Sequence, residues 1–175
     1  MSRLIVSRPI STGSRQVLQV VSTTKTDTFS TTSTSYTDVT GLSVTITPTT
    51  LGSQILVIAS VVGCTGASLT ESPSGLRLMR DTTAIGAGAT AGSRTLTSFA
   101  SISDSLDYSR LNHTYYPRQV TAVHLDSPAT TASVTYKVQM LVTTSTGYIN
   151  RGATDTDSSA FIRGASSITV IEVLP

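Results

Sequence analysis

The sequence predicts an all-β protein, a jelly roll or β-sandwich in which two antiparallel sheets pack together. Residues 42–46 alternate between apolar side chains and serine or threonine, the period-two pattern of a strand with one buried and one solvated face. Residues 55–59 are all apolar, which is typical of a strand covered on both faces. Turn-forming residues at 48–52 separate the two strands. A strand that is apolar on both faces must pack against other parts of the protein, which implies a second layer of structure beside its sheet.

The composition fits one folded domain. A chain of 175 residues can bury a core of its own. Its 38% hydrophobic residues and its net charge of +2 differ from the weakly hydrophobic, highly charged pattern of disordered chains. Serine and threonine are abundant, whereas glutamate and lysine are scarce, which favours strands over helices. The single cysteine, Cys64, cannot form an internal disulfide, so we expect synthesis in a reducing compartment.

Residues 1–15 are predicted to form an extended basic arm that precedes a jelly-roll domain at residues 16–175. Arg3, Arg8 and Arg15 all come before the first acidic residue of the chain. Such an arm can attach to a partner surface, and a frayed terminus is the open alternative. The apolar run at residues 4–6 is too short for a signal-peptide core or a membrane span. We therefore expect a soluble product that binds no membrane.

Next along the chain, residues 17–22 are predicted to form the first strand of the domain. The threonine- and serine-rich tract at residues 23–35 contains β-branched residues and no glycine or proline, which indicates irregular edge strands. Phe29 and Tyr36 are expected to anchor these strands inward. After the two central strands, residues 76–80 are predicted to form a further short strand.

The C-terminal half predicts four more strands, at residues 119–125, 134–142, 148–150 and 167–173. In the last strand, two apolar residues face one way and two face the other. A terminal strand that is apolar on both faces belongs in the interior of a sheet or against another subunit. Its candidate subunit-interface residues are Ile168, Val170, Ile171 and Val173.

The segment at residues 103–118 is the longest without a strand pattern, and it concentrates tyrosine and arginine. Long loops that carry these residues on a β scaffold are frequent recognition surfaces. An open alternative is that the tyrosines pack the loop down or seal a subunit contact. The candidate partner-binding residues are Tyr108, Arg110, Tyr115, Tyr116 and Arg118, together with the three arginines of the arm.

No constellation of residues predicts an enzyme or a metal site. His124 and Asp126 share one face of a predicted strand, but the chain has no G-x-S-x-G motif, and a chance serine partner is nearly certain in so serine-rich a sequence. Two histidines and one cysteine supply no zinc spacing. The acidic pair at residues 155–157 lacks the remaining ligands of a calcium loop. The sequence therefore predicts no catalytic residue and no bound metal.

Neither dinucleotide nor nucleic-acid binding is predicted. The glycines at 86, 88 and 92 are spaced one residue too widely for a dinucleotide fingerprint, and no amphipathic helix follows them. The arginines are scattered, and no basic run interleaves with aromatic residues. We expect a loop at residues 86–92, no cofactor and no nucleic-acid partner.

Several segments resemble a β-rich domain that is common in virion proteins of tailed bacteriophages, notably those of cyanobacteria. The order of the segments carries the resemblance, because each alone is of low complexity. Together they cover most of the chain from Val17 onward, and they lie at residues 17–48, 53–61, 76–88, 123–140 and 148–173.

The resemblance implies a non-enzymatic structural protein of the virion. In the family, similar jelly rolls occur as capsid decoration or cement proteins, commonly trimeric. For this chain we therefore expect a homotrimer that is made in the host cytoplasm, binds the major capsid protein and stabilises the capsid exterior. The alternative is a tail-fibre or receptor- or glycan-binding head, which would contact tail or fibre proteins, because the domain also forms the terminal head of longer fibres.

Overall fold

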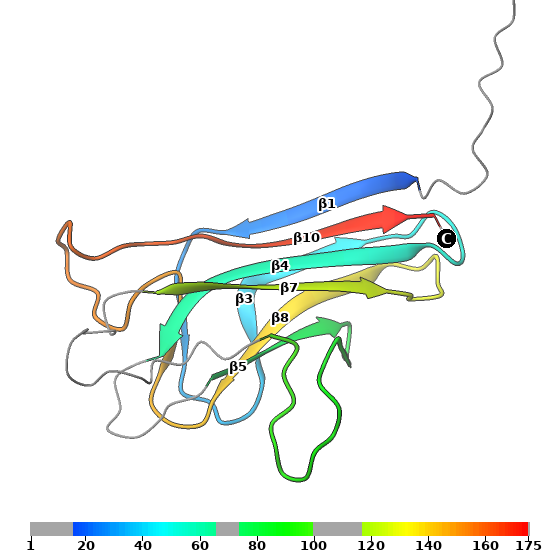
Figure 1. The fold of residues 1–175 in the computed structure, drawn as a ribbon. Coiled ribbons are helices and arrows are strands. Elements are labelled where there is room, and N and C mark those ends of the chain that lie inside the picture. Colours follow the sequence, from blue (N-terminus) through cyan, green and yellow to red (C-terminus); the bar gives the residue numbers. More distant parts are fainter. Residues whose placement is uncertain (1–15, 66–73, 100–116, 175) are drawn as a thin grey trace, which may run out of the picture.

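The computed structural model describes residues 16–65, 74–99 and 117–174 of the chain. These residues form ten strands in two antiparallel sheets that pack face to face (Figure 1). The described residues contain no helix, and hence none long and apolar enough to cross a membrane. The predicted all-β sandwich is confirmed.

The two sheets differ in size. Sheet A has six strands: β1 (Val17–Lys25), β10 (Ser166–Val173), β4 (Gln54–Thr65), β7 (Arg118–Asp126), β9 (Gly147–Ile149) and β2 (Phe29–Thr31). Sheet B has four strands: β3 (Thr37–Ile46), β8 (Val134–Val142), β5 (Ser74–Arg80) and β6 (Thr83–Ile85). Every long strand overlaps a segment that the sequence predicts as a strand. The sequence analysis missed β6, which is only three residues long.

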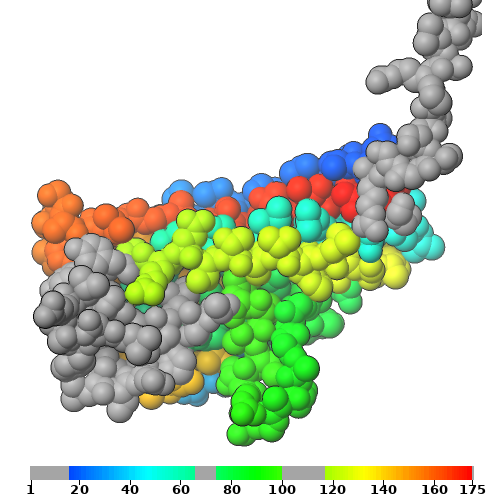
Figure 2. Space-filling model, in the orientation of Figure 1, coloured from blue at the N-terminus to red at the C-terminus, as the bar shows by residue number. Residues whose placement is uncertain are grey.

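The strand order is that of a jelly roll. The long strands of sheet A lie in the order β1-β10-β4-β7, and sheet B has the order β3-β8-β5-β6. The chain passes from one sheet to the other six times, between β2 and β3, β3 and β4, β4 and β5, β6 and β7, β7 and β8, and β8 and β9. Two Greek keys closed over one core give this order. In Figure 2, the four long strands of sheet A adjoin as blue, red, cyan and yellow-green bands.

The core lies between the sheets and is built by alternate residues of each strand. The predicted apolar face of β8 is confirmed, since all five of its side chains are at most 2% exposed. Burial of one such side chain stabilises a fold by about 1.5–3 kcal/mol. The inward residues of β8 are Val134, Tyr136, Val138, Met140 and Val142.

Strand β4 is the centre of sheet A. It pairs with β10 and then β9 along one edge and with β7 along the other. Its inward residues, Ile55, Val57 and Ala59, are fully buried. Leu56 and Ile58 point to the opposite side and are only half-buried. Sheet B therefore supplies one of the two covers that the apolar sequence of β4 predicts.

The serine- and threonine-rich tract forms the border of the sandwich, as predicted. Phe29 in β2 packs against the core, and the Tyr36 hydroxyl donates a hydrogen bond to the carbonyl of Leu96 at 2.8 Å. In β3 the pairing register with β8 shifts between Asp38 and Ser43. Gly41 lies in this bulge with φ of +81°, a conformation that glycine adopts without steric cost.

Residues 86–98 form a loop after β6, which includes the loop predicted at residues 86–92. This segment is part of the green projection from the body of the sandwich (Figure 2). Ser98 joins the loop to sheet B, because its hydroxyl donates to the Ile85 carbonyl at 2.6 Å and accepts from the Leu78 amide at 3.0 Å.

Candidate interaction surface

The outer face of sheet A is formed by the residues of β1, β10, β4 and β7 that point away from the core. The pairing register arranges their side chains in rows across the four strands. The first row is apolar and contains Val20, Ile171, Leu56 and Leu125. The second is mixed, with Ser22, Thr169, Ile58 and Val123, and the third carries only hydroxyl groups, from Thr24, Ser167, Ser60 and Thr121.

The apolar part of this face is exposed in the single chain. Val20 is 58% exposed, Val123 64% and Leu125 40%. Val17, at the start of β1, continues the apolar surface beside Val173. A contiguous exposed patch of aliphatic side chains across several strands is a mark of an interaction site.

No outward position of these four described strands carries a charged side chain. The charged or ionisable residues of these strands all occupy the alternate positions, and they are Lys25, Arg118, His124, Asp126 and Glu172. Hydroxyl groups are hydrogen-bonded within the face: Ser22 and Thr169 of the mixed row share a bond of 2.8 Å, and Ser60 of the hydroxyl row accepts one from Gln119 Nε2 at 2.6 Å. The outer face formed by β1, β10, β4 and β7 is therefore uncharged, whereas the Arg151 guanidinium lies 4.2 Å from the ring centre of Tyr148 on β9 of the same sheet.

The outer face of sheet B has the opposite character. Asp38 accepts hydrogen bonds from Lys137 Nζ at 2.8 Å and from Gln139 Nε2 at 2.6 Å. Arg77 donates to Gln139 at 2.8 Å, and its guanidinium lies 3.9 Å from the ring centre of Tyr36. The hydrogen bond from Lys137 is the main cause that lowers the pKa of Asp38. Sheet B thus presents a charged, solvated face, as an antiparallel sheet with one wet side does.

Only half of the predicted subunit-interface residues can reach a partner. Ile168 and Val170 are fully buried and point into the core, so their prediction as interface residues is wrong. Ile171 and Val173 lie on the outer face of sheet A, half-buried. The difference follows from the period of two, which sends alternate residues of β10 to opposite sides.

Most of the predicted partner-binding residues fall outside the described part of the chain. Among them, the structure describes only Arg118, which is exposed at the first position of β7 and pairs with Gly63 of β4. The residues that lie outside the described ranges are Arg3, Arg8, Arg15, Tyr108, Arg110, Tyr115 and Tyr116.

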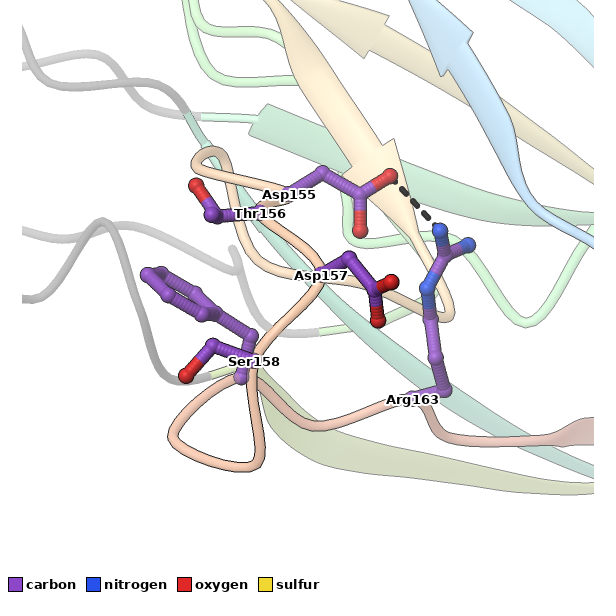
Figure 3. A pocket seen from close by; sticks show the side chains of 6 residues that line it. Asp155, Thr156, Asp157, Ser158 and Arg163 are labelled. Atoms are coloured by element: carbon purple, nitrogen blue, oxygen red, sulfur yellow. Dashed lines mark hydrogen bonds and ion pairs between the residues drawn. The ribbon is translucent and has the colours of Figure 1, made fainter.

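A shallow polar hollow lies in the loop between β9 and β10 (Figure 3). Its volume is about 310 Å³, and it is lined by Asp155, Thr156, Asp157, Ser158, Phe161 and Arg163. Asp155 pairs with Arg163 at 2.7 Å and with Arg151 at 3.4 Å, so this carboxylate is already engaged. The described residues contain no group of three side chains placed to hold a metal ion.

The ionisable groups inside the sandwich have structural partners. The Asp126 carboxylate accepts hydrogen bonds from Arg80 at 2.9 and 3.0 Å and from the Tyr136 hydroxyl at 2.7 Å. Burial, followed by this contact with Asp126, raises the pKa of Tyr136. His124 does share a face of β7 with Asp126, but these bonds already occupy the carboxylate. Burial also raises the pKa of the Cys64 thiol to about 11, which keeps the thiol protonated and a weak nucleophile at neutral pH.

The sequence analysis missed the outward residues of β1, β4 and β7. The apolar run at residues 55–59 indicates that the outward side chains of β4 also pack against something, because a strand that is apolar on both faces is normally buried on both. The pairing register that aligns these side chains across four strands is not visible in the sequence. The residues concerned are Val20, Leu56, Ile58, Val123 and Leu125.

No family model matches the chain, and no match is found among curated proteins. Fold and surface together define its class. The chain is a jelly-roll β-sandwich with one charged outer face and one neutral, partly apolar outer face.

Proposed function

We propose that this chain is a non-enzymatic structural protein of a tailed-bacteriophage virion. In this proposal it is a capsid decoration or cement subunit that forms homotrimers on the capsid exterior and binds the major capsid protein. The basic segment with Arg3, Arg8 and Arg15 contributes to attachment. The resemblance of the sequence to virion β-domains is the source of this assignment.

The observation that carries the proposal is the jelly-roll order combined with a neutral outer face. Viral capsid domains are among the protein classes that use this strand order. A neutral, partly apolar sheet face suits permanent protein contact better than reversible binding of a charged ligand. The buried ionisable groups are engaged in structural bonds, as Asp126 is with Arg80.

The test is binding of the purified chain to phage capsids that lack it. The full chain should sediment with the capsids, and a chain without residues 1–15 should stay in the supernatant, because the arm is lost. Circular dichroism of both proteins checks that the sandwich remains folded. Failure of the full chain to bind would contradict the capsid role. Equal binding of the shortened chain would contradict the role of the arm alone.

The second candidate function is a tail-fibre or receptor- or glycan-binding head. The hollow between β9 and β10 favours it, because it groups carboxylate, hydroxyl and guanidinium side chains around Phe161 in one exposed loop. Polar groups of this kind can bind the hydroxyls of a sugar. A head of this type is present in few copies per virion, whereas a decoration protein is present in many, so the copy number separates the two.

A further inference from the structure

We infer that the outer face of sheet A is the surface through which copies of this chain bind one another. The inference goes beyond the proposed function, because it names a two-fold contact between two copies of the chain, and it does not rest on the proposed homotrimer. It concerns the three rows of side chains defined above on β1, β10, β4 and β7.

The first step is that the outer face of sheet A has apolar side chains that the described residues do not cover. Sheet B buries the inward side chains of β4 completely, as at Val57 and Val61. On the other side, Leu56 and Ile58 are aliphatic but half-buried, and no described segment lies over them. A sheet whose strands are apolar on both faces is normally covered on both. In the inferred contact, another copy of the chain supplies the cover that the described residues do not.

The second step concerns the charge of the partner surface that covers the outer face of sheet A. A charged partner surface would lose hydration against this face without gaining an ion pair, and burying an unpaired charge is costly. The charged side chains at outward positions of the long described strands lie on sheet B instead, for example Asp38 and Lys137. A neutral partner is required, and another copy of the same face satisfies this condition without like-charge repulsion.

The third step is the pattern of the rows. One end of the face is aliphatic, with Val20, Ile171, Leu56 and Leu125, and the opposite end carries only hydroxyls. When two such faces meet, aliphatic rows can pack on aliphatic rows, while hydroxyls, each both donor and acceptor, can pair with hydroxyls. The face is therefore complementary to a copy of itself, which is what a two-fold contact between identical subunits requires.

The fourth step is the area. Strands about 4.8 Å apart and a rise of about 3.4 Å per residue give the four strands a footprint of roughly 20 by 24 Å. Two such footprints bury roughly 900–1,000 Å², near the lower limit of about 1,000 Å² for a specific interface. The whole face, including the hydroxyl row, must therefore take part in the contact.

The test is the mass of the purified chain in solution, measured by light scattering during size-exclusion chromatography at several concentrations. The wild-type protein should elute as a multiple of the 18.3 kDa chain. Val123→Lys places a charge in the middle row of the face, on β7, and should shift the mass to that of one chain. Thr45→Lys adds the same charge on the exposed outer face of sheet B and should leave the mass unchanged.

Thr121→Arg is the second variant, because its exposed position in the hydroxyl row tolerates a polar side chain even if Val123→Lys does not fold. It should also give the mass of one chain. A wild-type protein that stays at 18.3 kDa at all concentrations, or a folded variant that keeps the wild-type mass, would overturn the inference. No virion is used here, so an oligomer that fails to bind capsids would contradict only the proposed function.

Discussion

At the scale of single residues, buried polar side chains join parts of the chain that are distant in sequence. Glu172 of β10 is fully buried and accepts hydrogen bonds from the Thr49 amide at 2.8 Å and from Gln19 Nε2 at 2.6 Å. It thereby ties the turn between β3 and β4 to the edge strand β1. Burial raises the pKa of this carboxyl, but the hydrogen bonds from Gln19 and Thr49 outweigh burial and hold the pKa below its ordinary value of 4.5.

This lowered pKa predicts acid sensitivity. The stabilisation by the Glu172 carboxylate is fully present above pH 4.5, the unfolded-state pKa, and is lost as pH falls through the lower folded-state pKa. Glu172→Gln should lower the free energy of unfolding at neutral pH by about 1–3 kcal/mol, because amide hydrogens then face the Gln19 and Thr49 donors. It should also flatten the dependence of stability on pH below 4.5.

Urea denaturation across the acid range measures both effects. Asp157→Asn removes one carboxylate from the exposed β9–β10 loop and controls for the change in net charge. If Glu172→Gln and the wild-type protein lose stability in parallel as the pH falls, the assigned role of Glu172 is incorrect.

At the scale of the element, β10 shows how one strand serves two surfaces. Its residues alternate between the fully buried core side and the outer face of sheet A. The same substitution should therefore lower the free energy of unfolding by different amounts on the two sides of the strand. Ile168→Ala leaves a cavity in the core and should lower the free energy of unfolding by about 2–5 kcal/mol. Ile171→Ala should lower the free energy of unfolding of the single chain by less than half that amount, because the Ile171 side chain is only partly buried.

Denaturant unfolding of both alanine variants in the Val123→Lys background measures the difference in the absence of subunit contact. Equal costs at the two positions would show that β10 is covered on both sides within a single chain. That outcome would remove the basis for a subunit contact on sheet A.

The sequence predicted those elements whose signal is local. The period of two located β3 and β8, and the all-apolar run located β4, because side-chain alternation is set within one strand. The pairing register, and the choice of which face of a strand points to the core, depend on contacts between strands that are distant in sequence. The outward rows of sheet A could therefore not be predicted. Asn150 illustrates the same limit. It lies at the end of a predicted short strand, yet it is fully buried and donates hydrogen bonds to the carbonyls of Lys25 and Asp27 at 2.8 Å each.

At the scale of the whole molecule, the two outer faces of the sandwich are suited to different contacts. Sheet B carries the charged network around Asp38 and is suited to contact with water. Sheet A carries the neutral rows that we infer to bind other copies. The β9–β10 loop with its polar hollow lies at one end of the sandwich (Figure 1), separate from the neutral face. A subunit with this division can assemble through one sheet and leave the other exposed on the surface of a particle.

The central claim, that the chain is a structural subunit of the capsid exterior, is tested most directly by its copy number. Quantitative mass spectrometry of purified virions gives the ratio of this chain to the major capsid protein. We expect a ratio of the same order as the capsid protein, since a decoration subunit repeats with the capsid lattice. A handful of copies per particle would contradict capsid decoration and would favour a tail or receptor-binding head.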